Sequence, residues 1–102
     1  MFQFIVEAIP HPQSSNAQQF GGAWVTCWID FAGKEGAELL TKFYLEQEGW
    51  QIQGIDQVNW VVRDDVINEP QTLQYISEAE ESGASFVYHT WPLTSEDADT
   101  SL

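Results

Sequence analysis

Two stretches of the chain repeat one order of signals: apolar residues at helical spacing, then a glycine, then a strand-like run. The two glycines, Gly49 and Gly83, are separated by 83 − 49 = 34 residues. Paired-helix repeats have a similar period, but here strands separate the helices and there is no third copy. The sequence therefore predicts a mixed fold of helices and strands rather than a helical solenoid.

The first predicted helix spans about 34–48 and ends at Gly49. Glu35 and Glu38 lie in its first turn, where the helix dipole favours negative charge. Its apolar face is predicted to hold Gly36, Leu40, Phe43, Tyr44 and Gln47, with Ala37 and Leu39 at the margins. The second helix is predicted to begin at Asn68-Glu69-Pro70-Gln71, with Asn68 as the cap, and to end at Gly83. Its inward residues are predicted to be Leu73, Ile76 and Ala79, with Tyr75 beside them.

Strands are predicted where apolar and polar residues alternate. The run 2–9 places Phe2, Phe4, Val6 and Ala8 on one side and Gln3, Ile5, Glu7 and Ile9 on a second, partly wet face. The strongest strand is 23–31, whose core face would hold Ala23, Val25, Cys27, Ile29 and Phe31. Residues 50–64 are too long for one ordinary strand, so we expect a hairpin of 50–55 and 58–64 that turns at Asp56-Gln57, or else one long bulged strand. The last strand spans 84–91, with Phe86 and Tyr88 opposite Val87, His89 and Trp91.

From residue 23 the predicted order is strand, helix, strand, strand, helix, strand. This order resembles the split βαβ of the ferredoxin-like fold, with an extra strand at the N-terminus. The resemblance concerns topology alone and implies two helices on one face of an antiparallel sheet. We expect residues 1–93 to form this single α+β domain and residues 94–102 to form an acidic, frayed tail.

The charge balance narrows the possible partners. Three basic residues stand against sixteen acidic ones, which gives a net charge of −13. Nucleic-acid binding needs Lys and Arg against phosphate, so neither DNA nor RNA is expected as a partner. Anionic membrane surfaces are disfavoured for the same reason. Such acidity favours solubility or, alternatively, attraction to a basic protein.

The N-terminal run 1–9 carries Glu7 and no basic side chain, so it is predicted to be a strand rather than a secretory signal. With one cysteine and no apolar run long enough to cross a bilayer, a cytoplasmic protein is expected. Cys27 alternates with Val25 and Ile29, which predicts a buried, inert thiol.

No catalytic or metal-binding motif is present in the sequence. Cys27, His89 and Asp30 are the residue types of a thiol-based catalytic set, but Cys27 and Asp30 would point to opposite faces of one strand. The two histidines have no helical spacing suited to a metal. Enzymatic activity is therefore not expected, nor is a cofactor or a metal site.

Aromatic surface is the remaining candidate for function. Trp24 and Trp28 flank Thr26 on the face away from Cys27, and Trp91 alternates with His89 in the last strand. With both helices on the Cys27 face, two exposed indoles would need a cover, because contiguous apolar patches are rare on free surfaces. The candidate interface or ligand-binding residues are Trp24, Thr26, Trp28, Asp30, Tyr88, His89 and Trp91.

The sequence thus favours a small acidic interaction protein without enzymatic activity. We expect a homodimer that packs its Trp24/Trp28 faces together and binds a basic protein partner, for example as an inhibitor or immunity protein. The alternative is a small-ligand module, possibly an enzyme, in which a ferredoxin-like dimer encloses an aromatic cavity.

Overall fold

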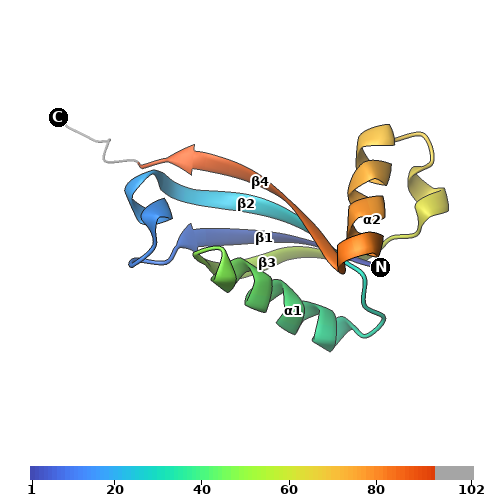
Figure 1. Cartoon of the computed structure of the whole chain (residues 1–102), viewed down its shortest axis with the longest axis horizontal. Coiled ribbons are helices and arrows are strands. Elements are labelled where there is room, and N and C mark those ends of the chain that lie inside the picture. The colour runs from blue at the N-terminus through green and yellow to red at the C-terminus, as the bar shows by residue number, and fades with distance from the viewer. Residues whose placement is uncertain (94–102) are drawn as a thin grey trace.

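The computed structural model describes residues 1–93, which form one four-stranded antiparallel sheet with two α-helices (Figure 1). The strand order across the sheet is β3-β1-β2-β4. The predicted tail 94–102 lies outside the described residues. The elements in chain order are β1 (Phe2–Pro10), η1 (Ser15–Gln18), β2 (Phe20–Ile29), α1 (Lys34–Gln47), β3 (Trp50–Trp60), η2 (Arg63–Val66), α2 (Pro70–Ser82) and β4 (Ala84–Pro92).

The expected α+β class is confirmed, but the ferredoxin-like order of strands is not. The N-terminal strand is no addition to the sheet, because β1 lies at its centre and pairs with both β2 and β3. Since β2 and β3 both run antiparallel to β1, they are parallel to each other, and α1 connects them in a βαβ unit across β1.

The hairpin expected within 50–64 is wrong, and the bulged strand forms instead. β3 runs from Trp50 to Trp60 along β1 without a turn. Its register against β1 shifts between Ile5 and Val6 and again between Glu7 and Ala8. Each shift leaves one extra residue in β3. These two bulges allow the long segment to form one strand without the turn that its length suggested.

The main core lies between α1 and one face of the sheet. Phe4, Val6 and Ala8 of β1 are fully buried there, which confirms the predicted inner face of this strand. Val25 and Cys27 of β2 are also fully buried, as their alternation predicts. Phe86 and Tyr88 of β4 complete this inner face, since they pair with Cys27 and Val25.

The predicted inward face of α1 is rotated from the observed one. The helix buries Ala37, Thr41 and Leu45, whereas Leu39 and Phe43 are exposed. The apolar pattern missed Thr41 because this residue is polar. Its hydroxyl donates a hydrogen bond of 2.8 Å to the Ala37 carbonyl, which satisfies the group inside the core.

Phe31 was also predicted to be a core residue, and it is exposed. The strand ends at Ile29, two residues earlier than expected. The Phe31 ring lies over Gly36, where a side-chain carbon would come within 2.3 Å of the ring. Phe31 therefore packs against the start of α1 rather than beneath it.

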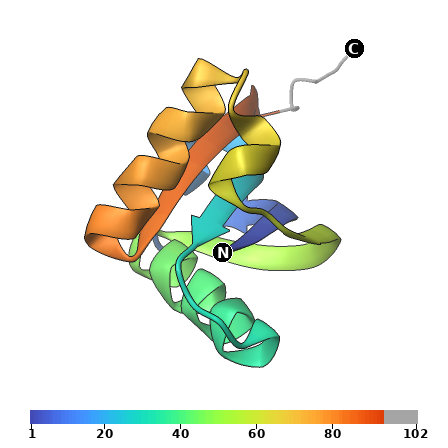
Figure 2. The same cartoon turned by 90° about the vertical axis from the view of Figure 1, so that its right-hand side faces the viewer.

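The two helices cover opposite faces of the sheet, which corrects the expectation that both lie on one face. α2 packs on the outer face, where Ile76 and Ala79 form a second buried cluster with Trp28. The Trp28 and Tyr75 rings are stacked, with their centroids 5.0 Å apart. Figure 2 shows α1 below the strands and α2 above them. Because Trp28 lies beneath α2, it is only 5% exposed.

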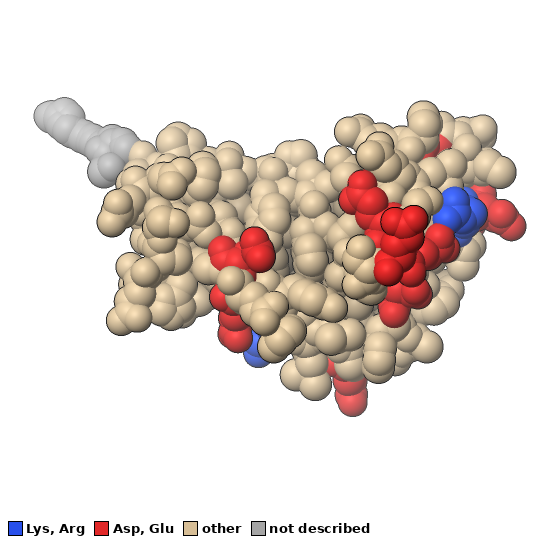
Figure 3. Space-filling view, in the orientation of Figure 1, with Lys and Arg blue, Asp and Glu red and all other residues tan. Residues whose placement is uncertain are grey.

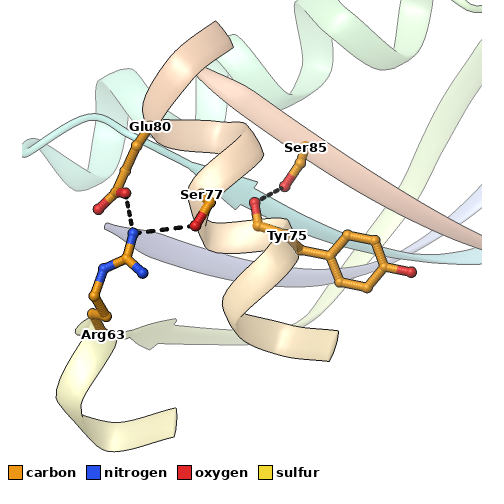
Figure 4. Close-up of polar contacts among 5 residues, drawn as sticks. All are labelled: Arg63, Tyr75, Ser77, Glu80 and Ser85. Carbon is orange, nitrogen blue, oxygen red and sulfur yellow. Dashed lines mark hydrogen bonds and ion pairs between the residues drawn. The ribbon is translucent and has the colours of Figure 1, made fainter. Parts of the chain in front are cut away.

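Polar contacts fix the position of α2 (Figure 4). The Ser85 hydroxyl donates a hydrogen bond of 2.6 Å to the Tyr75 carbonyl, which joins α2 to β4. Arg63 of η2 pairs with Glu80 and donates a hydrogen bond of 3.2 Å to the Ser77 hydroxyl. These bonds hold η2 and α2 together over one end of the outer face.

Both helices end at the predicted glycines. Gly49 and Gly83 have φ angles of 87° and 95°, a left-handed conformation that side chains disfavour. At the start of α2 the cap is Glu69 rather than the predicted Asn68, with Pro70 in the first turn. Within residues 1–93, neither helix is long and apolar enough to cross a membrane.

The opposite placement of the helices predicts different consequences for two tryptophans on the same face. Trp28→Ala should lower the free energy of unfolding by about 3–5 kcal/mol, because it leaves a cavity under α2. Trp24→Ala should lower this free energy by clearly less than Trp28→Ala does, because Trp24 is 41% exposed and leaves no enclosed cavity. Urea unfolding of both variants measures the difference, and equal losses would contradict the arrangement.

Candidate functional site: the open half of the outer face

α2 covers only one end of the outer face. Its cluster with the sheet contains Met1, Trp28, Val61 and Val87, all near the end where β1 begins and β2 ends. Figure 1 shows α2 standing across the strand direction at this end. Towards the other end, the outer face carries a set of half-buried or exposed residues that we call the open half: Ile5, Glu7, Ile9, Trp24, Thr26, His89 and Trp91.

Strand pairing sets these side chains in rows across the sheet. Glu7 pairs with Trp24, and Trp24 pairs with His89 on its other side. On the far side of Glu7 the partner is Gly54 of β3. The row therefore presents, in order, a glycine, a carboxylate, an indole and an imidazole. The next row presents Ile5 and Thr26, so apolar surface continues toward α2.

Trp91 lies in the open half because two glycines make room for it. A side-chain carbon on Gly22 would come within 2.2 Å of the Trp91 indole, and one on Gly21 within 3.0 Å. The indole therefore lies directly on the backbone of β2. Its centroid is 6.5 Å from that of Trp24, so the two rings form one aromatic surface.

A shallow hollow of about 130 Å³ opens beside Trp24. It is lined by Glu7, Trp24, Gly54, Ile55 and Asp56. Gly54 leaves space in the hollow, since a side-chain carbon at this position would have no atom within 4 Å apart from those of its two chain neighbours. The hollow thus brings two acidic residues together with one tryptophan.

No lysine or arginine side chain lies on the open half. Lys34 and Lys42 belong to α1, which covers the inner face, and Arg63 belongs to η2 and pairs with Glu80. Figure 3 shows acidic side chains gathered mainly at the α2 end of the molecule. The thirteen acidic residues among 1–93 leave this part of the chain at 3 − 13 = −10.

Four of the seven predicted site residues come together in the open half: Trp24, Thr26, His89 and Trp91. Trp28 is on the same face but beneath α2. Tyr88 is on the inner face, where burial raises the pKa of its hydroxyl to about 12. Asp30 is exposed beyond the end of β2, about 20 Å along the sheet from Trp24 and its neighbour His89.

The residues of the hypothetical catalytic set are therefore separated. Cys27 is fully buried on the inner face, whereas His89 is on the outer face and Asp30 lies beyond the strand end. Burial raises the pKa of the Cys27 thiol to about 12, so it carries no thiolate at neutral pH. Within residues 1–93, His, Cys, Asp and Glu side chains form no group of three suited to a metal ion.

Sequence reasoning missed the β1 and β3 contributions to the site. The alternation in 2–9 did place Ile5, Glu7 and Ile9 on a second, partly wet face. That face belongs to the site because β1 pairs with β2, which places Glu7 beside Trp24. Ile55 and Asp56 were hidden by the expected turn at Asp56-Gln57, and only the bulged register brings them next to Glu7.

Comparison with known protein families, with curated proteins and with solved structures finds no match to this chain.

The buried thiol predicts a pH dependence of stability. The pKa of Cys27 is raised from 9.0 to about 12 in the folded protein, so the neutral thiol is favoured there. Its contribution to stability is complete below pH 9 and is lost as pH rises from 9 to about 12, because the unfolded chain releases this proton first. The urea midpoint of the wild type should therefore fall more steeply over this range than that of Cys27→Ala.

Tyr88, whose pKa is raised mainly by burial, contributes a loss of the same sign in both proteins, so the comparison concerns the additional loss in the wild type. Parallel pH profiles for the two proteins, or fast reaction of native Cys27 with a thiol reagent at neutral pH, would contradict the burial of the thiol.

Proposed function

We propose that this chain is a non-enzymatic binding protein whose open half docks onto a basic protein partner. The observation that carries the proposal is the aromatic surface of Trp24 and Trp91 on a sheet face that α2 leaves half uncovered. Trp24, 41% exposed, retains about 100 Å² of accessible surface, so its burial would contribute about 2.5 kcal/mol before ordering costs. Tryptophan is also the residue type most enriched at binding hot spots.

The negative charges of the open half favour a basic protein over a second copy of the chain as the partner. A second copy of the chain would place an identical face against this one, because a two-fold dimer uses the same patch on both subunits. The interface would then contain Glu7 and Asp56 from both copies and no Lys or Arg from either face. Like charges brought together at an interface cost several kcal/mol. A protein with Lys or Arg at its surface offsets these charges, so it fits better than the homodimer expected from the two tryptophans.

A metabolite is less well supported as the occupant. Small-molecule pockets usually enclose about 300–1,000 Å³ and bury most of the ligand. The hollow beside Trp24 is about 130 Å³ and open, which suits one side-chain head group on a larger partner. An inhibitor that masks a basic active site would be one form of such a protein.

Capture from lysate tests the proposal when three immobilised proteins are compared: the wild type, Trp24→Ser and Trp60→Ser. Trp60 is the matched control because it is 54% exposed but packs edge-on against Phe2 on the inner face. The proposal predicts a basic protein that is retained by the wild type and Trp60→Ser and released by Trp24→Ser. Its association should slow as salt rises from about 0.1 M to about 1 M, because the screening length falls from about 10 Å to about 3 Å.

Sedimentation velocity on the same proteins separates the alternatives. The proposal predicts a monomer for the wild type alone at micromolar concentration. A wild-type dimer that Trp24→Ser converts to a monomer would make a second copy the occupant and would contradict a basic partner at this face. Retention of the same proteins by Trp24→Ser would contradict the use of the open half.

A further inference from the structure

Neither a left-handed backbone nor a close neighbour accounts for the glycine at position 54. Its φ angle is not in the left-handed region, which among the described glycines is adopted by Gly49 and Gly83. No other atom lies within 4 Å of the position that its side-chain carbon would occupy. Glycine weakens a strand; in strands it often marks a bulge, or a place where a ligand or another backbone approaches closely, and Gly54 lies between the two bulges of β3. Gly54 lines the hollow, so this free space is part of the hollow.

The walls of the hollow suit a positive charge. Glu7 and Asp56 supply two carboxylates, and the described residues provide neither of them with a hydrogen-bonded side chain or an ion pair. Trp24 supplies an indole, whose electron-rich face attracts a cation.

We infer that the hollow receives the guanidinium group of an arginine side chain from the partner. Arginine fits better than lysine because its planar group stacks on an indole and donates hydrogen bonds in two directions to separate carboxylates. Glu7 and Asp56 accept those bonds, Trp24 stacks on the group, and Gly54 leaves room for its entry. The inference rests on the proposed function and specifies the chemistry that the partner presents.

A nuclear magnetic resonance titration with a small probe tests the site without the partner. The probe is Nα-acetyl-arginine amide, and its neutral counterpart is the same compound built on citrulline. The signal is the indole N–H of Trp24, assigned by its loss in Trp24→Phe. We expect a saturable shift at millimolar probe for arginine and no saturable shift for citrulline, because only arginine is charged.

Gly54→Val provides the sharpest variant, because it fills the hollow without removing any of its groups. Valine suits a strand, so the melting temperature should stay the same or rise. Arginine binding should nevertheless weaken at least tenfold. Glu7→Gln should weaken it about fivefold or more by removing one charge. The matched control is Gln53→Val, an exposed change at the neighbouring residue of β3, which should leave binding unchanged.

The inference is overturned if the Trp24 signal shows no saturable shift, if citrulline shifts it equally, or if Gly54→Val binds arginine as well as the wild type does. These failures differ from a failure of the proposed function. A captured basic protein that Trp24→Ser releases and Gly54→Val retains would refute the arginine site while leaving the open half as the interface. Retention by both variants would refute the interface itself.

Discussion

The stack of Trp28 on Tyr75, with Ile76 and Ala79 beside it, fixes where α2 lies, and the nature of the remaining surface depends on that position. A helix of thirteen residues is about 20 Å long, whereas the strands of nine to eleven residues extend for about 30 Å or more. Because α2 crosses the strands at one end, it cannot also cover the other end. The uncovered region is therefore a direct result of how this helix is placed.

The open half combines apolar rings with negative charges, and a monomer neither buries the rings nor neutralises the charges. Trp24 and Trp91 present apolar rings, and Glu7 and Asp56 present negative charges with no Lys or Arg on the same face. A second copy would bury the rings but bring the charges together. A basic partner would bury the rings and neutralise the charges at the same time. This joint requirement is what favours a basic protein over self-association.

Alternation alone predicted which residues of β1 and β2 face the main core, because Phe4 and Val25 lie on strands with a strict period of two. In β4 it separated Phe86 and Tyr88 from Val87, His89 and Trp91 but did not assign either set to the core. It could not predict which helix covers which face. Trp24 and Trp28 have the same parity, so the sequence treats them alike. They differ through register: Trp28 pairs with Ser85, next to the end of α2, while Trp24 pairs with His89, further along β4.

The hollow could not be predicted from the sequence either, because it depends on how β3 pairs with β1. The turn-forming residues Asp56 and Gln57 suggested that the chain reverses, and the actual strand continues because β1 pairs with its whole length. Pairing between strands distant in the sequence thus overrode a local turn preference. Thr41 shows the same limit in α1, where a hydrogen bond to its own helix allows a polar side chain into the core.

The central claim is that α2 divides the outer face into a covered end and an open end. Hydroxyl-radical footprinting read by mass spectrometry tests it most directly, because it compares all five tryptophans in the unmodified protein at once. Trp24 and Trp60, 41% and 54% exposed, should oxidise rapidly, while Trp28 and Trp50, each 5% exposed, should be protected. Equal protection of Trp24 and Trp28 would show that the whole face is covered, and equal reactivity would show that α2 does not lie on it; either result would contradict the account.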